Sequence, residues 1–167
     1  AAGEPQTEPY RPVRLDCAPM SAEALHAPEN TKQVRQMLEE ILKGEAPISQ
    51  ALLLRRLLQA VGIPRAGTRI QERIEMLLNG MKLGTTDQGG MRFYWLPDQD
   101  PERYDSCRPA REEDGRREPR DVPEQETASA IRQILAQQVG LPREDLLRLT
   151  AKTLGYPRMG TQVSAMA

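Results

Sequence analysis

Aromatic residues and long apolar runs are both scarce in this sequence. Phe, Trp and Tyr make up 4% of the 167 residues and hydrophobic residues 38%, against 14 prolines and 12 glycines. That supply is lean for one compact core, so we expect part of the chain to be unpacked. No apolar run approaches the 18 or so residues needed to span a bilayer, and we predict no membrane partner. Cys17, Cys107 and the single histidine, His26, are too few for a Cys/His zinc site.

Net charge is also nearly absent, because 23 Lys and Arg oppose 24 Asp and Glu. This balance excludes a chain-wide attraction to nucleic acid and leaves only local patches. The charge is unevenly distributed, with net −3 over residues 1–30, +4 over 31–97, −5 over 98–126 and +3 over 127–167. We therefore predict a Pro-rich N-terminal segment, a first basic domain, an acidic Pro-rich linker that is mostly mobile, and a second basic domain.

The two basic stretches contain the same unit twice. The sequence Gly-Ile-Pro-Arg-Ala-Gly-Thr-Arg-Ile at 62–70 recurs as Gly-Tyr-Pro-Arg-Met-Gly-Thr-Gln-Val at 155–163. The Leu-Leu-Arg at 53–55 returns as 146–148 at the same offset. Five identities in nine positions, with apolar positions kept around them, indicate an internal repeat.

The first copy predicts three helices. The first follows a cap at Asn30 or Thr31 and ends at Gly44, and the second begins at a Ser49 cap and ends at Gly62. The third follows a capping-box pattern formed by Thr68 and Gln71. The residues expected to face the core are Val34, Met37, Leu38, Ile41, Leu42, Leu53, Leu54, Leu57, Leu58, Val61, Ile70, Ile74, Leu77 and Leu78.

After the third helix the pattern changes to that of a β-hairpin, with strands at 81–86 and 91–96 around a turn at 87–90. Period-two alternation predicts Phe93 and Trp95 in the core, with Arg92 and Tyr94 facing water. Three helices and a hairpin are the winged-helix arrangement, in which the second and third helices form a helix-turn-helix.

The second copy predicts a helix from Thr127 with Ile131, Ile134, Leu135 and Val139 inward. A second helix after Pro142 has Leu146, Leu147, Ala151 and Leu154 inward, and a third starts at Thr161. The sequence has no room for a second wing, so this unit is truncated as given. The fold class predicted is mainly α with a small β-hairpin (α+β), as tandem winged-helix units in a piece of a longer protein.

The repeated turns and Leu-Leu-Arg segments resemble the C-terminal uncharacterised region of very large bacterial proteins. Those proteins are similar to superfamily 1 DNA helicases and carry a restriction-endonuclease-like domain just upstream. The resemblance covers roughly residues 31–167 and implies an accessory module of a helicase–nuclease machine in DNA repair or defence. It implies helicase and nuclease domains of the parent chain as partners, and it transfers no catalytic residue to this stretch.

Candidate DNA contacts lie on the third helix, the turn before it, the wing, and the equivalent positions of the second copy. They are Arg65, Thr68, Arg69, Gln71, Arg73, Lys82, Arg92, Arg158, Thr161 and Gln162. Arg and Gln can hold phosphates or read base edges. One alternative is that the helix residues are only solvated polar side chains. The other is that Arg65 and Arg158 stabilise their own turns, for instance by hydrogen bonds to carbonyls of the preceding helix. Glu72 would repel phosphate.

We interpret His26, Cys17 and Cys107 as incidental, and free thiols fit a reducing cytoplasm. The charge-mixed run 111–117 indicates a solvated linker. We find no paired carboxylates, no nucleophile–base set and no phosphate loop, and predict no catalysis and no cofactor. The predicted function is weak, non-specific binding of duplex or junction DNA. The alternative is a winged-helix module that docks protein, within the parent chain or outside it.

Overall fold

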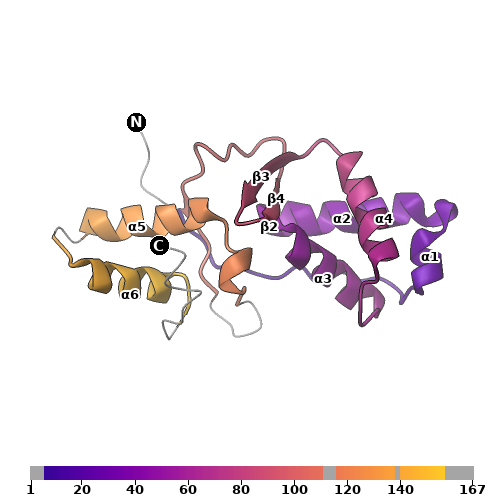
Figure 1. Ribbon diagram of the computed structural model, residues 1–167, viewed down its shortest axis with the longest axis horizontal. Coiled ribbons are helices and arrows are strands. Elements are labelled where there is room, and N and C mark those ends of the chain that lie inside the picture. The colour runs from indigo at the N-terminus through magenta and orange to yellow at the C-terminus, as the bar shows by residue number, and fades with distance from the viewer. Residues whose placement is uncertain (1–5, 111–115, 138–139, 157–167) are drawn as a thin grey trace. The chain divides into compact units, whose positions relative to one another are not determined.

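The computed structural model describes residues 6–110, 116–137 and 140–156. The chain divides into two compact units, which are described separately. The central unit is Pro12–Gln99, and the terminal unit combines Ala1–Arg11 with Asp100–Ala167. The chain therefore begins in the terminal unit, builds the central unit, and returns at Asp100 (Figure 1).

The central unit is helical with a small antiparallel sheet, an α+β arrangement. Its elements are α1 (Ala22–His26), the 3-10 helix η1 (Pro28–Asn30), α2 (Thr31–Glu45), β2 (Ile48–Ser49), α3 (Gln50–Val61), α4 (Thr68–Asn79), β3 (Gly84–Gln88) and β4 (Met91–Trp95). The three strands have the order β2-β4-β3. Strand β2, which lies between α2 and α3 in the sequence, thus adds a third strand to the hairpin of β3 and β4.

Helix α2 buries the predicted stripe of apolar residues, which is confirmed at Val34, Met37, Leu38, Ile41 and Leu42. The helix does not end at Gly44 but continues to Glu45. The Glu45 carboxylate is fully buried. It accepts hydrogen bonds from the Val13 backbone amide at 3.0 Å and from Arg56 Nε at 3.0 Å. These partners come from the segment before α2 and from α3, and they hold the last turn of α2 in helical form.

Helix α3 begins and ends at the predicted signals. The Ser49 hydroxyl accepts from the Leu52 amide at 3.1 Å, and Gly62 adopts a left-handed φ of 79°. The Ile63 amide then donates to the Leu58 carbonyl at 3.0 Å, which completes a Schellman-type end. The predicted core face is wrong at two positions, because Leu52, which was not predicted, is buried and Leu54 is only half-buried. A run of three leucines exceeds the width of one helix face, and the third faces outward.

Helix α4 buries Ile70, Ile74, Leu77 and Leu78, as predicted. The predicted capping box is wrong. Gly67 is the N-cap, and no side chain of the described residues caps the helix there. Thr68 is already inside the first turn, and Gln71 Nε2 donates to the Ala66 carbonyl at 3.4 Å.

The hairpin is tighter than predicted, since β3 and β4 are joined by Gly89 and Gly90 alone, with φ of 56° and 79°. Positive φ at both positions is the type I′ pattern, which glycine adopts without strain. Phe93 and Trp95 are buried as predicted, but the expectation that Tyr94 faces water is wrong, since it is 1% exposed. Strand β4 lies between β2 and β3, and both of its faces are covered, so alternation does not separate core from solvent there.

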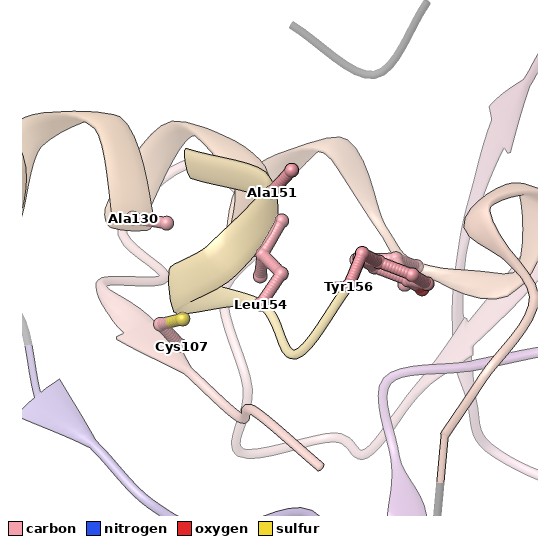
Figure 2. Packing of buried hydrophobic residues seen from close by; sticks show 6 residues of the cluster. Cys107, Ala130, Ala151, Leu154 and Tyr156 are labelled. Carbon is pink, nitrogen blue, oxygen red and sulfur yellow. The ribbon is translucent and has the colours of Figure 1, made fainter. Parts of the chain in front are cut away.

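In the terminal unit, β1 (Gln6–Thr7) pairs in parallel with β5 (Ser106–Cys107), and a bridge between Tyr10 and Ala110 extends the pairing. The remaining elements are the 3-10 helix η3 (Pro119–Asp121), α5 (Glu124–Gln137) and α6 (Arg143–Thr153). Its small apolar core is shown in Figure 2. The members are Cys107, Val122, Ala130, Ala151, Leu154 and Tyr156.

The structure departs from the expectation of a mostly mobile linker at residues 98–126. Cys107, Arg108, Arg117, Val122 and Glu126 of this segment are all buried. The acids and bases of the segment bind each other inside the unit, which a count of apolar residues does not reveal. The predicted solvated run is wrong at Arg117, and residues 111–115 lie outside the described part of the chain.

The second copy follows the predicted helices in part. Helix α5 begins at Glu124 rather than Thr127 and buries Ala130 and Ile134, whereas Leu135 is 45% exposed. On α6, Ala151 is buried and Leu154 is buried just after it, but Leu146 and Leu147 are only half-buried. Val139 and the helix predicted from Thr161 lie outside the described residues.

The end of α6 repeats the backbone pattern at the end of α3. Gly155 has a φ of 99°, as Gly62 has 79°, and each follows the last residues of its helix. The Tyr156 amide donates to the Ala151 carbonyl at 2.8 Å, and the bond from Ile63 to Leu58 joins the equivalent positions. The two similar turn sequences thus follow helices that end with the same hydrogen bond.

Candidate nucleic-acid interface

The start of α4 gathers four of the predicted contact residues on exposed positions. Arg65 lies in the turn between α3 and α4, and Thr68, Arg69 and Gln71 lie in the first turn of α4; all four are exposed. The first amides of a helix lack intrahelical partners and carry the positive end of the helix dipole. Because the N-cap is Gly67, this helix start presents backbone amides beside two guanidinium groups. Such a surface suits a phosphate group.

Arg73 does not belong to that exposed group, although it is one of the candidate DNA contacts predicted from the sequence. It is half-buried, and its Nη2 donates to Thr31 Oγ1 at 2.6 Å. Its Nε is buried without a hydrogen-bond partner among the described residues. The side chain thus ties the middle of α4 to the first residue of α2.

The hairpin contributes less positive charge than expected. Lys82 is exposed between α4 and β3, but Arg92 is half-buried and its Nε lies 3.6 Å from Asp87 Oδ1. The neighbouring Tyr94 hydroxyl and Asp87 carboxylate both raise the pKa of Arg92. Burial raises the pKa of Tyr94, although Arg92 acts in the opposite direction. Arg92 is therefore engaged within its own hairpin.

The surface around these residues is mixed in chemistry. Glu72 is exposed on α4, and Glu75 is half-buried one turn further along. Met76, on the same helix, is 60% exposed, which is unusual for a large apolar side chain. The exposed surface of α4 is therefore modestly basic at the start of the helix, and acidic and apolar further along it.

The remaining candidates belong to the second copy. Arg158, Thr161 and Gln162 lie outside the described residues, so their surroundings are not part of this site.

A cluster of buried charges in the terminal unit was missed by the sequence analysis. The Glu126 carboxylate is fully buried and accepts from Arg108 Nη2 at 3.0 Å and from both terminal nitrogens of Arg117. The Arg117 and Arg108 guanidinium carbons lie 4.0 and 5.1 Å from the centre of the Tyr10 ring. The Tyr156 hydroxyl donates to the Arg117 carbonyl at 2.6 Å. This arrangement joins the segment after β1, the segment after Asp100, the start of α5 and the segment after α6 within the terminal unit.

A pocket lies on the outer side of α3, with a volume of about 530 Å³. Its walls are the half-buried Leu54, the neighbouring Leu58, and Ile63 and Pro64 from the following turn. Sequence reasoning missed it because Leu54 was assigned to the core.

The residues interpreted as incidental occupy unremarkable positions. Cys17 and Cys107 are free thiols, and Cys17 Sγ donates to the Ala60 carbonyl at 3.4 Å. His26 ends the short helix α1. Within residues 6–110, 116–137 and 140–156, no group of three or more His, Cys, Asp or Glu side chains is placed to hold a metal ion. No helix in those ranges combines the length and apolar character that crossing a bilayer requires.

Comparison with known proteins gives one match. A family model described as "Protein of unknown function (DUF3320)" matches residues 23–72, from α1 to the first turn of α4. The resemblance described above predicts an uncharacterised family region in this part of the chain, and the match confirms that prediction for residues 23–72. No curated protein and no solved structure matches the chain.

Proposed function

We propose that residues 31–97 form a winged-helix unit that binds DNA weakly and without base specificity, as a non-catalytic accessory module. The order of elements supports this assignment: α2, β2, α3, α4, β3 and β4 reproduce three helices, a first strand after the first helix, and a closing hairpin. The sheet order β2-β4-β3 is the one in which that first strand pairs with the second strand of the hairpin. In this arrangement α4 is the helix that meets DNA.

The observation that carries the DNA proposal is the exposed start of α4. Arg65, Thr68, Arg69 and Gln71 surround a helix N-terminus whose N-cap is a glycine. The backbone amides and guanidinium groups at this helix start suit phosphate contacts, and contacts of that kind position a protein on DNA without reading its sequence. With so few exposed cations the affinity is weak, about 10⁻⁴ to 10⁻⁶ M near physiological salt.

The wider context of the proposal rests on the sequence. We place the module in a bacterial protein with helicase and nuclease domains, because of the family resemblance of the repeated turns. We also propose a partial second winged-helix unit at 127–167, supported by the shared ending of α3 and α6. The free thiols support a location in the reducing cytoplasm.

Fluorescence anisotropy with two unrelated labelled duplexes and one four-way junction, at several salt concentrations, tests the proposal. The variant Arg65→Ala/Arg69→Ala should weaken binding equally on both duplexes. It should also reduce the salt slope by about one for each phosphate that the variant no longer neutralises.

The matched control is Lys43→Ala, which removes a charge from the same unit. Lys43 is exposed and lies about 18 Å along α2 from Thr31, the residue that contacts α4. This control should leave binding unchanged. Absence of binding by the wild type at low salt, or an equal weakening in the control, would contradict the proposal.

A second candidate is protein docking through the same face of α4. It is favoured by Met76, which is 60% exposed, and by the engagement of Arg73 and Arg92 within the fold. A docked protein would respond little to salt and would be released by Met76→Gln. DNA binding would respond steeply to salt and would tolerate that change.

A further inference from the structure

Arg73, in the second turn of α4, binds another helix through its guanidinium group. Its Nη2 donates to Thr31 Oγ1 at 2.6 Å, a short bond of the charge-assisted kind. The side chain is half-buried, whereas Arg69, four residues earlier on the same helix, is exposed. Residues at this spacing share a helix face and lie about 6 Å apart along the axis. Arg73 therefore lies directly behind the exposed arginine of the proposed DNA surface.

The hydroxyl that accepts this bond belongs to a well-anchored residue. Thr31 is the first residue of α2, and its backbone amide donates to the Pro28 carbonyl in η1. The Asn30 side chain donates to the Ala24 carbonyl at 2.8 Å, and α1 contacts both α2 and α4 (Figure 1). Because α1 and η1 hold Thr31 in place, a rotation of α4 about its own axis would break the bond to Arg73.

The burial of Arg73 has a cost that the stability of the unit does not explain. Its Nε is buried without a hydrogen-bond partner among the described residues. A buried donor without a partner destabilises a fold, and an apolar side chain at this margin of the helix would avoid that cost. A role in the surface that α4 presents accounts for the arginine better than a role in the stability of the core.

We propose that Arg73 is a positioning residue for the DNA surface at the start of α4, and not a phosphate contact; this inference rests on the proposed function. The bond to Thr31 fixes the rotation of α4, so that Arg69 and the first amides of the helix face outward together. A phosphate then meets donors that are already arranged, and binding does not require the helix to be ordered first.

The two roles predict different effects of salt. Loss of a positioning residue lowers the fraction of molecules in which α4 is correctly oriented, so the dissociation constant rises while the number of neutralised phosphates stays the same. Loss of a phosphate contact lowers the salt slope by about one. Thr31→Val separates the two roles, because it removes the hydroxyl and retains every cation.

The test is fluorescence anisotropy of the full chain with a labelled duplex at several salt concentrations. Thr31→Val and Arg73→Met should each weaken binding about fivefold, the effect of one lost hydrogen bond, with little change in the salt slope. The double variant should bind no more weakly than either single variant, since the same bond is missing in all three. Thr31→Ser keeps the hydroxyl and should restore wild-type affinity.

The matched control is Thr86→Val in β3. The Thr86 hydroxyl also accepts a bond from a side-chain nitrogen, Trp95 Nε1 at 2.9 Å, and Thr86 is half-buried as Thr31 is. Circular dichroism under the assay conditions checks that each variant is folded. Thr86→Val should leave DNA affinity unchanged, which distinguishes a loss of positioning from a general loss of stability.

Several results would overturn the inference. Wild-type affinity in Thr31→Val, or an equal weakening in Thr86→Val, would do so while leaving the proposed DNA binding intact. A salt slope lower by about one in Arg73→Met, with Thr31→Val unaffected, would identify Arg73 as a phosphate contact that leaves Thr31 when DNA binds. If Arg73→Met does not fold, Thr31→Val and Thr31→Ser decide the question alone. Absence of wild-type binding at every salt concentration would overturn the proposed function, and this inference with it.

Discussion

Replacing Glu126 by glutamine would leave two buried guanidinium groups, those of Arg108 and Arg117, without their carboxylate. The shape of the side chain is kept, but the charge that balances them is removed. Removing one partner from a buried ion pair costs about 3–5 kcal/mol, because the remaining charge stays buried and uncompensated. Small domains have a total stability of about 5–15 kcal/mol. We therefore expect Glu126→Gln to remove a large share of the stability of the terminal unit, and so to increase its transient unfolding.

The control is Glu118→Gln, the same substitution in the same segment. Glu118 Oε2 lies 2.9 Å from Arg120 Nε, but both side chains are about half exposed, at 51% and 56%. An exposed pair of this kind is worth about 0.2–1 kcal/mol. The two variants make the same chemical change, so their contrast compares a buried carboxylate that binds two arginines with an exposed carboxylate paired with Arg120.

Amide hydrogen exchange read by mass spectrometry is the suitable assay, because the single tryptophan, Trp95, reports only on the central unit. Peptides from β5, α5 and α6 should lose protection in Glu126→Gln, and peptides from α2 and α3 should lose less. A loss below about 1 kcal/mol in the terminal unit, or one equal to that of Glu118→Gln, would refute the reasoning.

The same cluster predicts a dependence on pH. Burial alone would raise the pKa of Glu126, but Arg108 and Arg117 outweigh it and lower the pKa from 4.5 to about 2. A carboxyl group with a lowered pKa stabilises the fold above its ordinary pKa, and that contribution disappears as the pH falls toward the folded value. Exchange protection of the terminal unit should therefore fall between about pH 4.5 and 2, and Glu126→Gln should lack this component. Equal pH slopes in the two proteins would contradict the assignment.

Three further predictions concern single sites. Gly62→Ala should destabilise the central unit by about 1 kcal/mol or more in urea unfolding, because φ is 79° there, whereas Gly80→Ala, with φ of −81°, should cost less. Leu57→Ala should cost about 2–5 kcal/mol in the same assay, since the side chain is fully buried on α3, and a cost near zero would mean that the helix face is misassigned. Burial raises the pKa of Cys107 to about 12, so it should resist alkylation at pH 8 while half-buried Cys17 reacts, and equal rates by mass spectrometry would contradict the packing of β5.

The sequence predicts the central unit well where one local signal determines the answer. The Ser49 cap, the left-handed Gly62 and the stripe of buried residues on α4 each follow from short-range patterns, and each is confirmed. The predictions that are wrong depend on distant partners. Tyr94 is buried on β4, the central strand of its sheet, and the pairing of β4 with β2 joins residues on either side of α3 and α4. Period-two alternation carries no information about it.

In the candidate site, too, short-range patterns predict some positions, and contacts between distant segments determine the others. Exposure of Arg65 and Arg69 follows from the position of the turn and the amphipathic pattern of α4. The hydrogen bond from Arg73 to Thr31 requires α4 to cross the start of α2, which no local pattern encodes. An arginine at the margin of the apolar face of a helix can face water or a neighbouring helix. The packing of α4 across the start of α2 determines which of the two Arg73 does.

The terminal unit shows why composition was misleading for residues 98–126. An acidic segment poor in apolar residues usually stays disordered because it cannot bury enough surface to offset the loss of chain entropy. Here Arg108, Arg117 and Glu126 bury their charges together, and the Tyr10 ring covers the guanidinium groups. Tyr10 precedes the central unit in the sequence and the other three residues follow it. The ordering of the segment therefore depends on a contact between residues on either side of the whole central unit in the sequence, and the composition of the segment alone does not encode it.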